Sequence, residues 1–285
     1  MTLRTLVDVD TLAAHLDDPN WVVLDCRFEL TRPAWGEEGY AAGHIPGAQY
    51  AHLDRDLAAA PTASSGRHPL PAPETFAELA RRWGINADSQ IVVHDQANGV
   101  YAARAWWLFR WLGHESVAVL QGGLAAWTAS GRSLTTATSS RASGNFAARP
   151  QPNRTVTVDD VLDSIESHRL HVVDGRGADR FAGQNETMDP VAGHVPGAVN
   201  HPFVSNFAAD GTWLPETELR ARWEKTLRGR PANEVVTMCG SGVSACLNLL
   251  ALETLGIRGA RLYTGSWSEW VRDPSRPVAK GVTAS

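Results

Sequence analysis

The chain has 285 residues and a formal net charge of −5, and at roughly 100–200 residues per domain this length suggests two domains. Because the chain has no excess of basic residues, nucleic acid is not expected as a partner. A small anionic substrate remains compatible with this charge. No apolar run reaches the roughly 18 residues that span a bilayer, and the N-terminus lacks a signal-peptide pattern, so we expect a cytoplasmic protein without a membrane partner. Three cysteines, an odd and sparse set, are typical of reduced thiols, and no cysteine–histidine cluster has the spacing of a metal site.

The first half alternates amphipathic helices with short apolar strands. After a first helical stripe, the apolar run 21–24 predicts a strand. A second stripe predicts a helix over 71–83, and the run 91–93 predicts a strand that is followed by a helical run through residue 112. Strands that alternate with helices indicate a parallel sheet covered on both faces, so the expected fold class is α/β.

The second half repeats these landmarks in the same order. Residues 43–48 (GHIPGA) return as residues 193–198 (GHVPGA), 150 positions later. The predicted strand 91–93 is matched by the apolar run 235–237, which a helical run through residue 255 again follows. Several landmarks in one order predict a duplicated α/β domain.

A segment of linker composition separates the two halves. Residues 131–153 are rich in Ser, Thr, Ala, Pro and Gly and have no sustained apolar period. We therefore expect one domain over 1–130, a linker over 131–153 and a second domain over 154–285.

Cys239 stands at the head of a loop with the pattern of an anion-binding cradle. An apolar strand precedes it, the turn Gly240-Ser241-Gly242-Val243-Ser244 follows, and good helix formers come next. In an open parallel sheet such a loop lies at the carboxyl ends of the strands, where ligands bind. Glycines let backbone amides point inward, and the helix N-terminus adds partial positive charge, so the thiolate is favoured. We predict that Cys239 is a nucleophile held by the amides of this loop, with the two serine hydroxyls as further donors to its sulfur.

The other two cysteines and the matching loop of the first half indicate that only the second domain is catalytic. Cys246 lies inside a helical run and Cys26 follows an apolar strand, so both are expected to pack in the core. Asp95 occupies the position of Cys239 in the first half. The first domain is therefore predicted to be inactive and the second to be catalytic.

These features resemble the tandem-domain rhodanese family over nearly the whole chain. The resemblance rests on the repeated Gly-His-x-Pro-Gly-Ala element and on residues 263–270 (YTGSWSEW), which are similar to the family's C-terminal signature. Residues 239–244 (CGSGVS) are similar to the mercaptopyruvate sulfurtransferase branch, which usually has threonine in place of Ser244. The thiosulfate branch typically has arginine and lysine where this chain has Gly240 and Ser241. The resemblance implies two rhodanese-like domains and a sulfur atom carried on Cys239.

The resemblance also implies how the donor is held. It assigns the donor's carboxylate to Arg180, whose planar guanidinium can bind it through two hydrogen bonds. The mercaptopyruvate branch usually offers a second arginine before the second Gly-His element, but residues 183–190 contain none. Asn185 or Thr187 could substitute by hydrogen bonding, or a different donor could be used. Thiosulfate, a dianion, would gain most from cations that this neutral loop lacks, so we expect 3-mercaptopyruvate as donor and keep thiosulfate as the alternative.

Further site residues follow from the same resemblance. His68 matches a histidine near the catalytic cysteine, and Asp54 matches its acidic partner, both in the first half. A histidine that titrates near neutrality could move a proton during the acceptor step. Asp174 and Arg176 are expected to form an ion pair at a strand end, although Arg176 could still face the site.

The expected chemistry is a two-step transfer without metal or cofactor. Cys239 takes sulfur from the donor as a persulfide, and a thiol such as reduced thioredoxin, or cyanide, then accepts it. A cysteine phosphatase uses a similar loop but needs Cys-x5-Arg, and the sixth residue after Cys239 is Ala245. A catalytically silent binding module, such as a sulfur-relay scaffold, is the alternative from another class.

Overall fold

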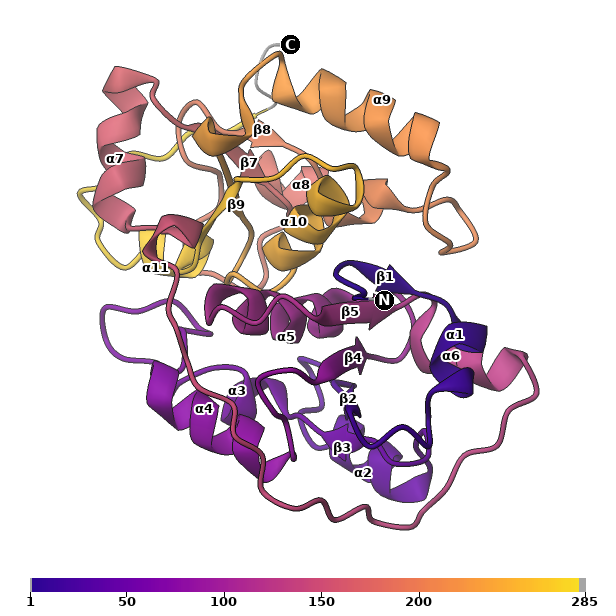
Figure 1. Cartoon of the computed structure of the whole chain (residues 1–285). Coiled ribbons are helices and arrows are strands. Elements are labelled where there is room, and N and C mark those ends of the chain that lie inside the picture. The colour runs from indigo at the N-terminus through magenta and orange to yellow at the C-terminus, as the bar shows by residue number, and fades with distance from the viewer. Residues whose placement is uncertain (1, 282–285) are drawn as a thin grey trace. The chain divides into compact units, whose positions relative to one another are not determined.

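A computed structural model describes residues 2–281, which form two compact units. The first unit runs to Ala59, resumes at Leu70 and ends at Gln151. The second unit comprises residues 60–69 together with the chain from Pro152 onward, and most of it is salmon to yellow in Figure 1. Within residues 2–281, every helix is too short or too polar to span a bilayer.

Each unit is built on a five-stranded parallel sheet, and the two strand orders correspond. The order is β1-β5-β4-β2-β3 in the first unit and β6-β10-β9-β7-β8 in the second, with every pairing parallel. The predicted duplication of an α/β domain is therefore confirmed. The strands of the first unit are β1 (Leu6–Val7), β2 (Trp21–Asp25), β3 (Gln49–Tyr50), β4 (Gln90–His94) and β5 (Val117–Leu120). Those of the second are β6 (Thr155–Val156), β7 (His171–Asp174), β8 (Val199–Asn200), β9 (Val235–Met238) and β10 (Arg261–Tyr263).

Helices cover both faces of the second sheet because its strands are apolar on both sides. Val172 and Val236 pack in a cluster with residues of α7 and α11, whereas the adjacent Val173 and Val235 pack with α9 and α10. Figure 1 shows α7 on one side of the strands and α9 on the other. The helices of this unit are α7 (Val158–Ser167), α8 (Ala178–Phe181), α9 (Glu216–Leu227), α10 (Ala245–Thr254) and α11 (Ser266–Trp270), with short 3-10 turns at Pro152–Arg154, Phe203–Asn206 and Ala232–Glu234.

The first unit follows the same plan. Val23 and Val92 pack with Leu12 of α1 and Trp127 of α6, and α5 lies against β4 and β5. The helices are α1 (Val9–Ala14), α2 (Trp35–Ala42), α3 (Leu53–Asp56), α4 (Pro73–Arg82), α5 (Val100–Trp111) and α6 (Gly123–Ala129).

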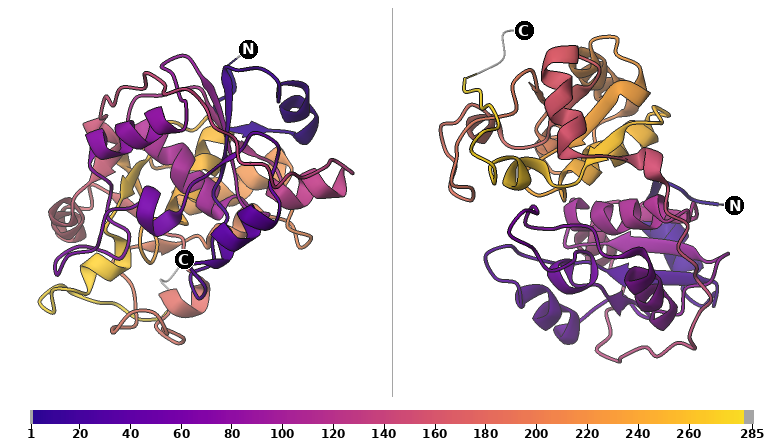
Figure 2. Two further views of the ribbon diagram at one scale, coloured as in Figure 1. Left: turned by 90° about the horizontal axis from the view of Figure 1, so that it is seen from below. Right: turned by 90° about the vertical axis from the view of Figure 1, so that its left-hand side faces the viewer.

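The segment expected as a linker lies along the first unit. Thr135 exchanges two backbone hydrogen bonds with His44, and the amide of Phe146 donates to the carbonyl of Ile85 at 3.0 Å. Figures 1 and 2 show this stretch following the outside of that unit as an extended strap. Backbone pairing, rather than an apolar period, holds it there, and composition alone does not reveal such pairing.

Residues 60–69 belong to the first half of the sequence but pack with the second unit. Gly66 lies against the turn that starts α11, where a Cβ atom would come within 2.4 Å of the carbonyl oxygen of Gly265. The amide of Arg67 donates to Oγ of Ser268 at 3.0 Å. The first half thus contributes side chains to the second unit.

Candidate active site

The loop that carries Cys239 lies between β9 and α10, at the carboxyl edge of the second sheet. β9 ends at Met238 and α10 begins at Ala245, as the sequence predicts. β9 is flanked by β7 and β10 on its two sides, so the loop sits near the middle of the sheet edge. This is the position where open parallel sheets bind their ligands.

The start of α11 fixes the direction of the loop backbone. The carbonyl oxygens of Cys239 and Gly240 accept hydrogen bonds from the amides of Trp267 (3.0 Å) and Ser268 (2.9 Å). The amide of Cys239 donates to Oγ of Ser266 at 3.1 Å. Because the first two loop carbonyls are turned toward α11, the amides that follow are free to face the sulfur. Ser266 is a supporting residue that the sequence analysis did not identify.

Gly242 supplies the amide that reaches the sulfur. Its N–H donates to Sγ of Cys239 at 3.2 Å. The φ angle of Gly242 is +78°, and a Cβ atom here would lie 2.3 Å from the carbonyl oxygen of Thr264. Both the left-handed backbone and the close approach require glycine. The hydrogen bond places a donor and a partial positive charge where a thiolate would carry its negative charge.

The three cysteines differ in their surroundings as predicted. Cys26 is fully buried, and burial together with the charge of Asp25 raises the pKa of its thiol well above the ordinary value. Cys246 is also fully buried and donates to the carbonyl of Gly242 at 3.3 Å, so it supports the loop from behind. Cys239 is also buried, at 2% exposed, and its sulfur accepts a hydrogen bond from the amide of Gly242.

The matching loop of the first unit holds a carboxyl group in the same position. Asp95 follows β4, the counterpart of β9, and its carboxylate accepts hydrogen bonds from four amides, those of Ala97 (3.1 Å), Gly99 (2.9 Å), Tyr101 (2.9 Å) and Ala102 (3.5 Å). Burial raises the pKa of Asp95, although these amides act in the opposite direction. One unit therefore fills the cradle with a fixed carboxylate, and the other places a thiol there.

Two guanidinium groups from the β7–α8 region lie beside the cysteine loop. Arg176 is held by Asp174 through paired hydrogen bonds, the shortest 2.7 Å, which confirms the expected ion pair. Its guanidinium also lies 4.6 Å from the ring centre of Trp267. Burial alone would lower the pKa of Arg176, but the charges of Asp174, Glu186 and Cys239 outweigh burial and raise it.

Arg180 is the second cation, and its partner is a carboxylate that sequence reasoning missed. Glu186 accepts from Arg180 at 2.9 Å and from Arg176 at 3.3 Å, and its side chain is almost completely buried. Burial alone would raise the pKa of Glu186, but hydrogen bonds from Arg180 and from the amides of Met188 and Asp189 lower it. Glu186 thereby stays ionised and holds both arginines in place.

The hydroxyl of Ser241 has a histidine as its partner. Nδ1 of His68 lies 2.7 Å from this Oγ, and His68 is 6% exposed. Ser241 therefore contacts a titratable ring, and the expected hydrogen bonds from Ser241 and Ser244 to the sulfur stay predictions. Asp54 lies in α3 of the first unit, and its expected pairing with His68 stays a prediction.

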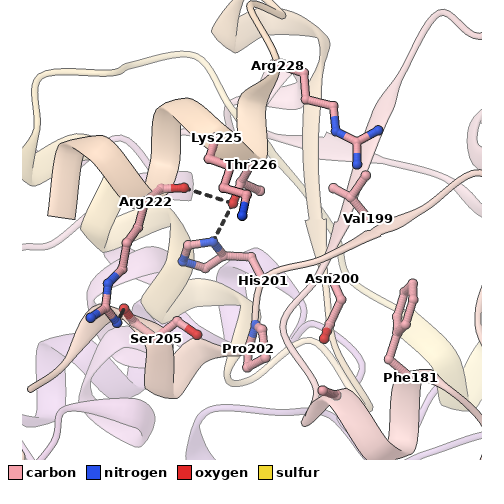
Figure 3. A pocket seen from close by; sticks show the side chains of 11 residues that line it. Phe181, Val199, Asn200, His201, Pro202, Ser205, Arg222, Lys225, Thr226 and Arg228 are labelled. Carbon is pink, nitrogen blue, oxygen red and sulfur yellow. Dashed lines mark hydrogen bonds between the residues drawn. The ribbon is translucent and has the colours of Figure 1, made fainter. Parts of the chain in front are cut away.

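A separate cavity of about 370 Å³ lies along the edge strand β8, between α8 and α9. Figure 3 shows Arg222, Lys225 and Arg228 around it, and the ring of His201 joined to Thr226 by a 2.7 Å hydrogen bond. None of its lining residues belongs to the loop 239–244. Among residues 2–281, no group of three or more acidic, histidine or cysteine side chains could hold a metal ion.

Comparison with known proteins assigns the chain to a family. The model of the rhodanese-like domain matches it twice, over residues 8–130 and 157–273. The chain therefore belongs to the rhodanese family and carries two copies of its domain. It is 46% identical over 283 residues to a Pseudomonas aeruginosa protein named "Probable 3-mercaptopyruvate sulfurtransferase", covering 99% of this chain and 100% of that one.

Two further comparisons place the chain among tandem sulfurtransferases. A Mycobacterium tuberculosis relative that carries the name of a thiosulfate sulfurtransferase is 38% identical over 269 residues, covering 91% of each chain. The crystal structure of a 3-mercaptopyruvate sulfurtransferase from Escherichia coli superposes with a TM-score of 0.80 at 35% identity, covering 93% of this chain and 100% of that one. The resemblance inferred from the motifs is thus confirmed.

Proposed function

We propose that the protein is a sulfurtransferase that moves sulfur from 3-mercaptopyruvate to a thiol or cyanide through a persulfide on Cys239. The observation that carries the proposal is the hydrogen bond from Gly242 to Sγ of Cys239 in a loop whose counterpart binds a carboxylate. A cradle that stabilises an anionic oxygen can equally stabilise a thiolate and the terminal sulfur of a persulfide. The names of the Pseudomonas aeruginosa and Escherichia coli relatives agree with this donor, and that of the Mycobacterium tuberculosis relative agrees with the alternative.

The first step breaks the carbon–sulfur bond of the donor. The thiolate of Cys239 attacks the thiol sulfur of 3-mercaptopyruvate, and the electron pair of the carbon–sulfur bond moves to the methylene carbon. That carbon takes up a proton, so pyruvate leaves and the new sulfur–sulfur bond remains on Cys239. Arg180 binds the donor's carboxylate through two hydrogen bonds, and Arg176 adds positive charge beside the loop. Because the carbanion is stabilised by the adjacent carbonyl group, no metal is required.

The second step returns the cysteine to its thiolate form. A thiolate acceptor attacks the outer sulfur of the persulfide, and the sulfur–sulfur bond to Cys239 breaks with both electrons left on Sγ. A dithiol such as thioredoxin then expels the sulfur as sulfide and closes its own disulfide, whereas cyanide leaves as thiocyanate. We propose that His68, acting through Ser241, takes the proton of the incoming thiol; the 2.7 Å contact between the two side chains supports this role. Because the cycle starts from a reduced thiol, we place its action in the cytoplasm.

The preferred sulfur donor, 3-mercaptopyruvate or thiosulfate, distinguishes the proposed function from its alternative. The loop positions after the nucleophile, Gly240 and Ser241, are neutral, so a thiosulfate dianion finds less compensating charge there than a monocarboxylate finds at Arg180. The test is steady-state kinetics with each donor and cyanide as the common acceptor. We expect a higher kcat/KM with 3-mercaptopyruvate, and a higher value with thiosulfate would reassign the donor while leaving the persulfide chemistry intact.

A further inference from the structure

Asp189 occupies a bridge between two guanidinium groups. One of its carboxylate oxygens accepts a hydrogen bond from Nη1 of Arg67, and the other lies 3.3 Å from Nη2 of Arg180. The carboxylate is only 3% exposed, while the side chains of Arg67 and Arg180 are 26% and 22% exposed. A buried carboxylate thus lies between two cations that remain partly open to solvent.

This bridge lies directly over the cysteine loop. A Cβ atom at Gly240 would lie 2.9 Å from Nη2 of Arg67 and 3.6 Å from Nη2 of Arg180. Gly240 follows Cys239 in the chain, so both guanidinium groups reach within one residue of the reacting sulfur. A donor whose thiol meets Cys239 would carry its carboxylate a few bonds away, within the span of these two groups.

The backbone of Arg67 is fixed to the second unit at three successive residues. Gly66 packs against Gly265, the amide of Arg67 donates to Ser268, and His68 pairs with Ser241. A cation that is anchored in this way is pre-organised, so little conformational freedom is lost when it binds a ligand.

We propose that Arg67 and Arg180 together form the clamp for the donor's carboxylate, and that Asp189 is an internal carboxylate which the donor displaces. The inference rests on the proposed function and deepens it: the ligand class is a short 2-oxo acid with one carboxylate. Arg67 supplies the second guanidinium that residues 183–190 lack. Asn185, the substitute considered from the sequence, instead donates to Asp179 at 3.2 Å.

Displacement of Asp189 is helped by its own surroundings. Burial raises the pKa of Asp189 and the charge of Glu186 acts in the same direction, whereas Arg67 and Arg180 oppose both. The two arginines therefore hold the ionised carboxylate of Asp189 in a position where it has lost most of its hydration, and this loss weakens the pairing. An incoming carboxylate that keeps part of its solvation can replace it.

The test uses two alkylating reagents that differ only in charge. Iodoacetate and iodoacetamide both form a sulfur–carbon bond at Cys239 as iodide leaves, but only iodoacetate carries a carboxylate. The ratio of the two rates, followed by fragment-ion mass at Cys239 because Cys246 lies on the same peptide, reports the clamp. The iodoacetamide rate alone reports the thiolate. We expect Arg67→Gln to lower the ratio about tenfold, as removal of one charge-assisted hydrogen bond implies.

Three further variants complete the experiment. Arg180→Gln is expected to lower the ratio similarly, Asp189→Asn to raise it, and Lys225→Gln, which removes one positive charge from the separate cavity of the same unit, to leave it unchanged. A wild-type ratio in Arg67→Gln alongside a lowered ratio in Arg180→Gln would overturn the role of Arg67. A lowered ratio in Asp189→Asn would overturn the displacement. Alkylation needs no sulfur transfer, so these outcomes are independent of whether 3-mercaptopyruvate is the donor.

Discussion

The backbone N–H of Gly242 donates to Sγ of Cys239 at 3.2 Å, so a peptide group rather than a side-chain base faces the nucleophile. Asp95 accepts hydrogen bonds from four amides in the equivalent loop of the first unit, so both loops turn backbone amides toward the side chain at this position. The two units therefore share one anion cradle and differ in the group placed inside it.

Gly242→Ala should impair both folding and sulfur transfer. The substitution forces alanine into a left-handed backbone at a cost of about 1–2 kcal/mol, and its Cβ atom would collide with the carbonyl of Thr264. Gly256→Ala is the matched control, because Gly256 has the same φ of +78° and no atom within 4 Å of its Cβ position. Urea unfolding should show a larger loss for Gly242→Ala, and only this variant should slow alkylation of Cys239. Equal losses and equal alkylation rates would contradict the role of the loop.

Asp95→Ala should destabilise the first unit without changing the rate of sulfur transfer at Cys239. Removal of the carboxylate leaves four amides without their acceptor, those of Gly99 and Ala102 in buried residues, which costs about 1–3 kcal/mol. Thermal unfolding measures the loss, and persulfide formation on Cys239 should keep its wild-type rate at temperatures where the variant is folded. A stability equal to that of wild type would show that the amides find other partners.

His68→Gln should slow the acceptor step and spare the donor step. The ring contacts Ser241 rather than the sulfur, and general acid–base catalysis contributes on the order of 10²-fold or more. Single-turnover mixing separates the steps: the persulfide forms at the wild-type rate, and its transfer to a thiol slows. Ser241→Ala should give the same pattern, because it removes the group through which His68 acts. Slow persulfide formation in both variants would place the pair in the donor step instead.

Stability of the second unit should fall as the pH drops from 6.5 toward 4. Burial lowers the pKa of His201 from its ordinary 6.5 to about 4, so the unfolded chain binds the proton more tightly than the folded one. Above pH 6.5, neutral His201 makes its full contribution to the free energy of unfolding. At pH 5 this free energy is lower by about 2 kcal/mol. Burial also lowers the pKa of His171 and His194, which adds in the same direction.

Urea unfolding at pH 7 and pH 5 measures this effect. His201→Gln should reduce the difference between the two free energies of unfolding. The part of the difference that comes from the other histidines should remain. An undiminished difference would show that His201 does not carry it.

The repeated pattern made most of the fold predictable. Apolar runs at 21–24, 91–93 and 235–237 are buried strands in the structure, since a strand covered on both faces must be apolar throughout. The strand–loop–helix pattern around Cys239 likewise fixed the position of the nucleophile, because a local motif determines its own backbone.

Contacts between distant segments could not be predicted. Ser266, Glu186 and Asp189 reach the site through pairings that depend on tertiary packing, and none has a local motif of its own. Arg67 stands next to a histidine that the family resemblance selects, yet only the placement of residues 60–69 on the second unit brings it to Asp189. Side-chain partners of this kind are set by the fold as a whole and not by spacing along the chain.

The central claim is that Cys239 carries the transferred sulfur. The most direct measurement is peptide mapping by mass after brief treatment of the reduced protein with 3-mercaptopyruvate and no acceptor. No Lys or Arg separates Cys239 from Cys246, so fragment ions of their shared peptide must locate the added mass. We expect one added sulfur atom on Cys239, and none on Cys246 or on the peptide with Cys26. Sulfur on either of those two cysteines, or pyruvate release that persists in Cys239→Ala, would contradict the account.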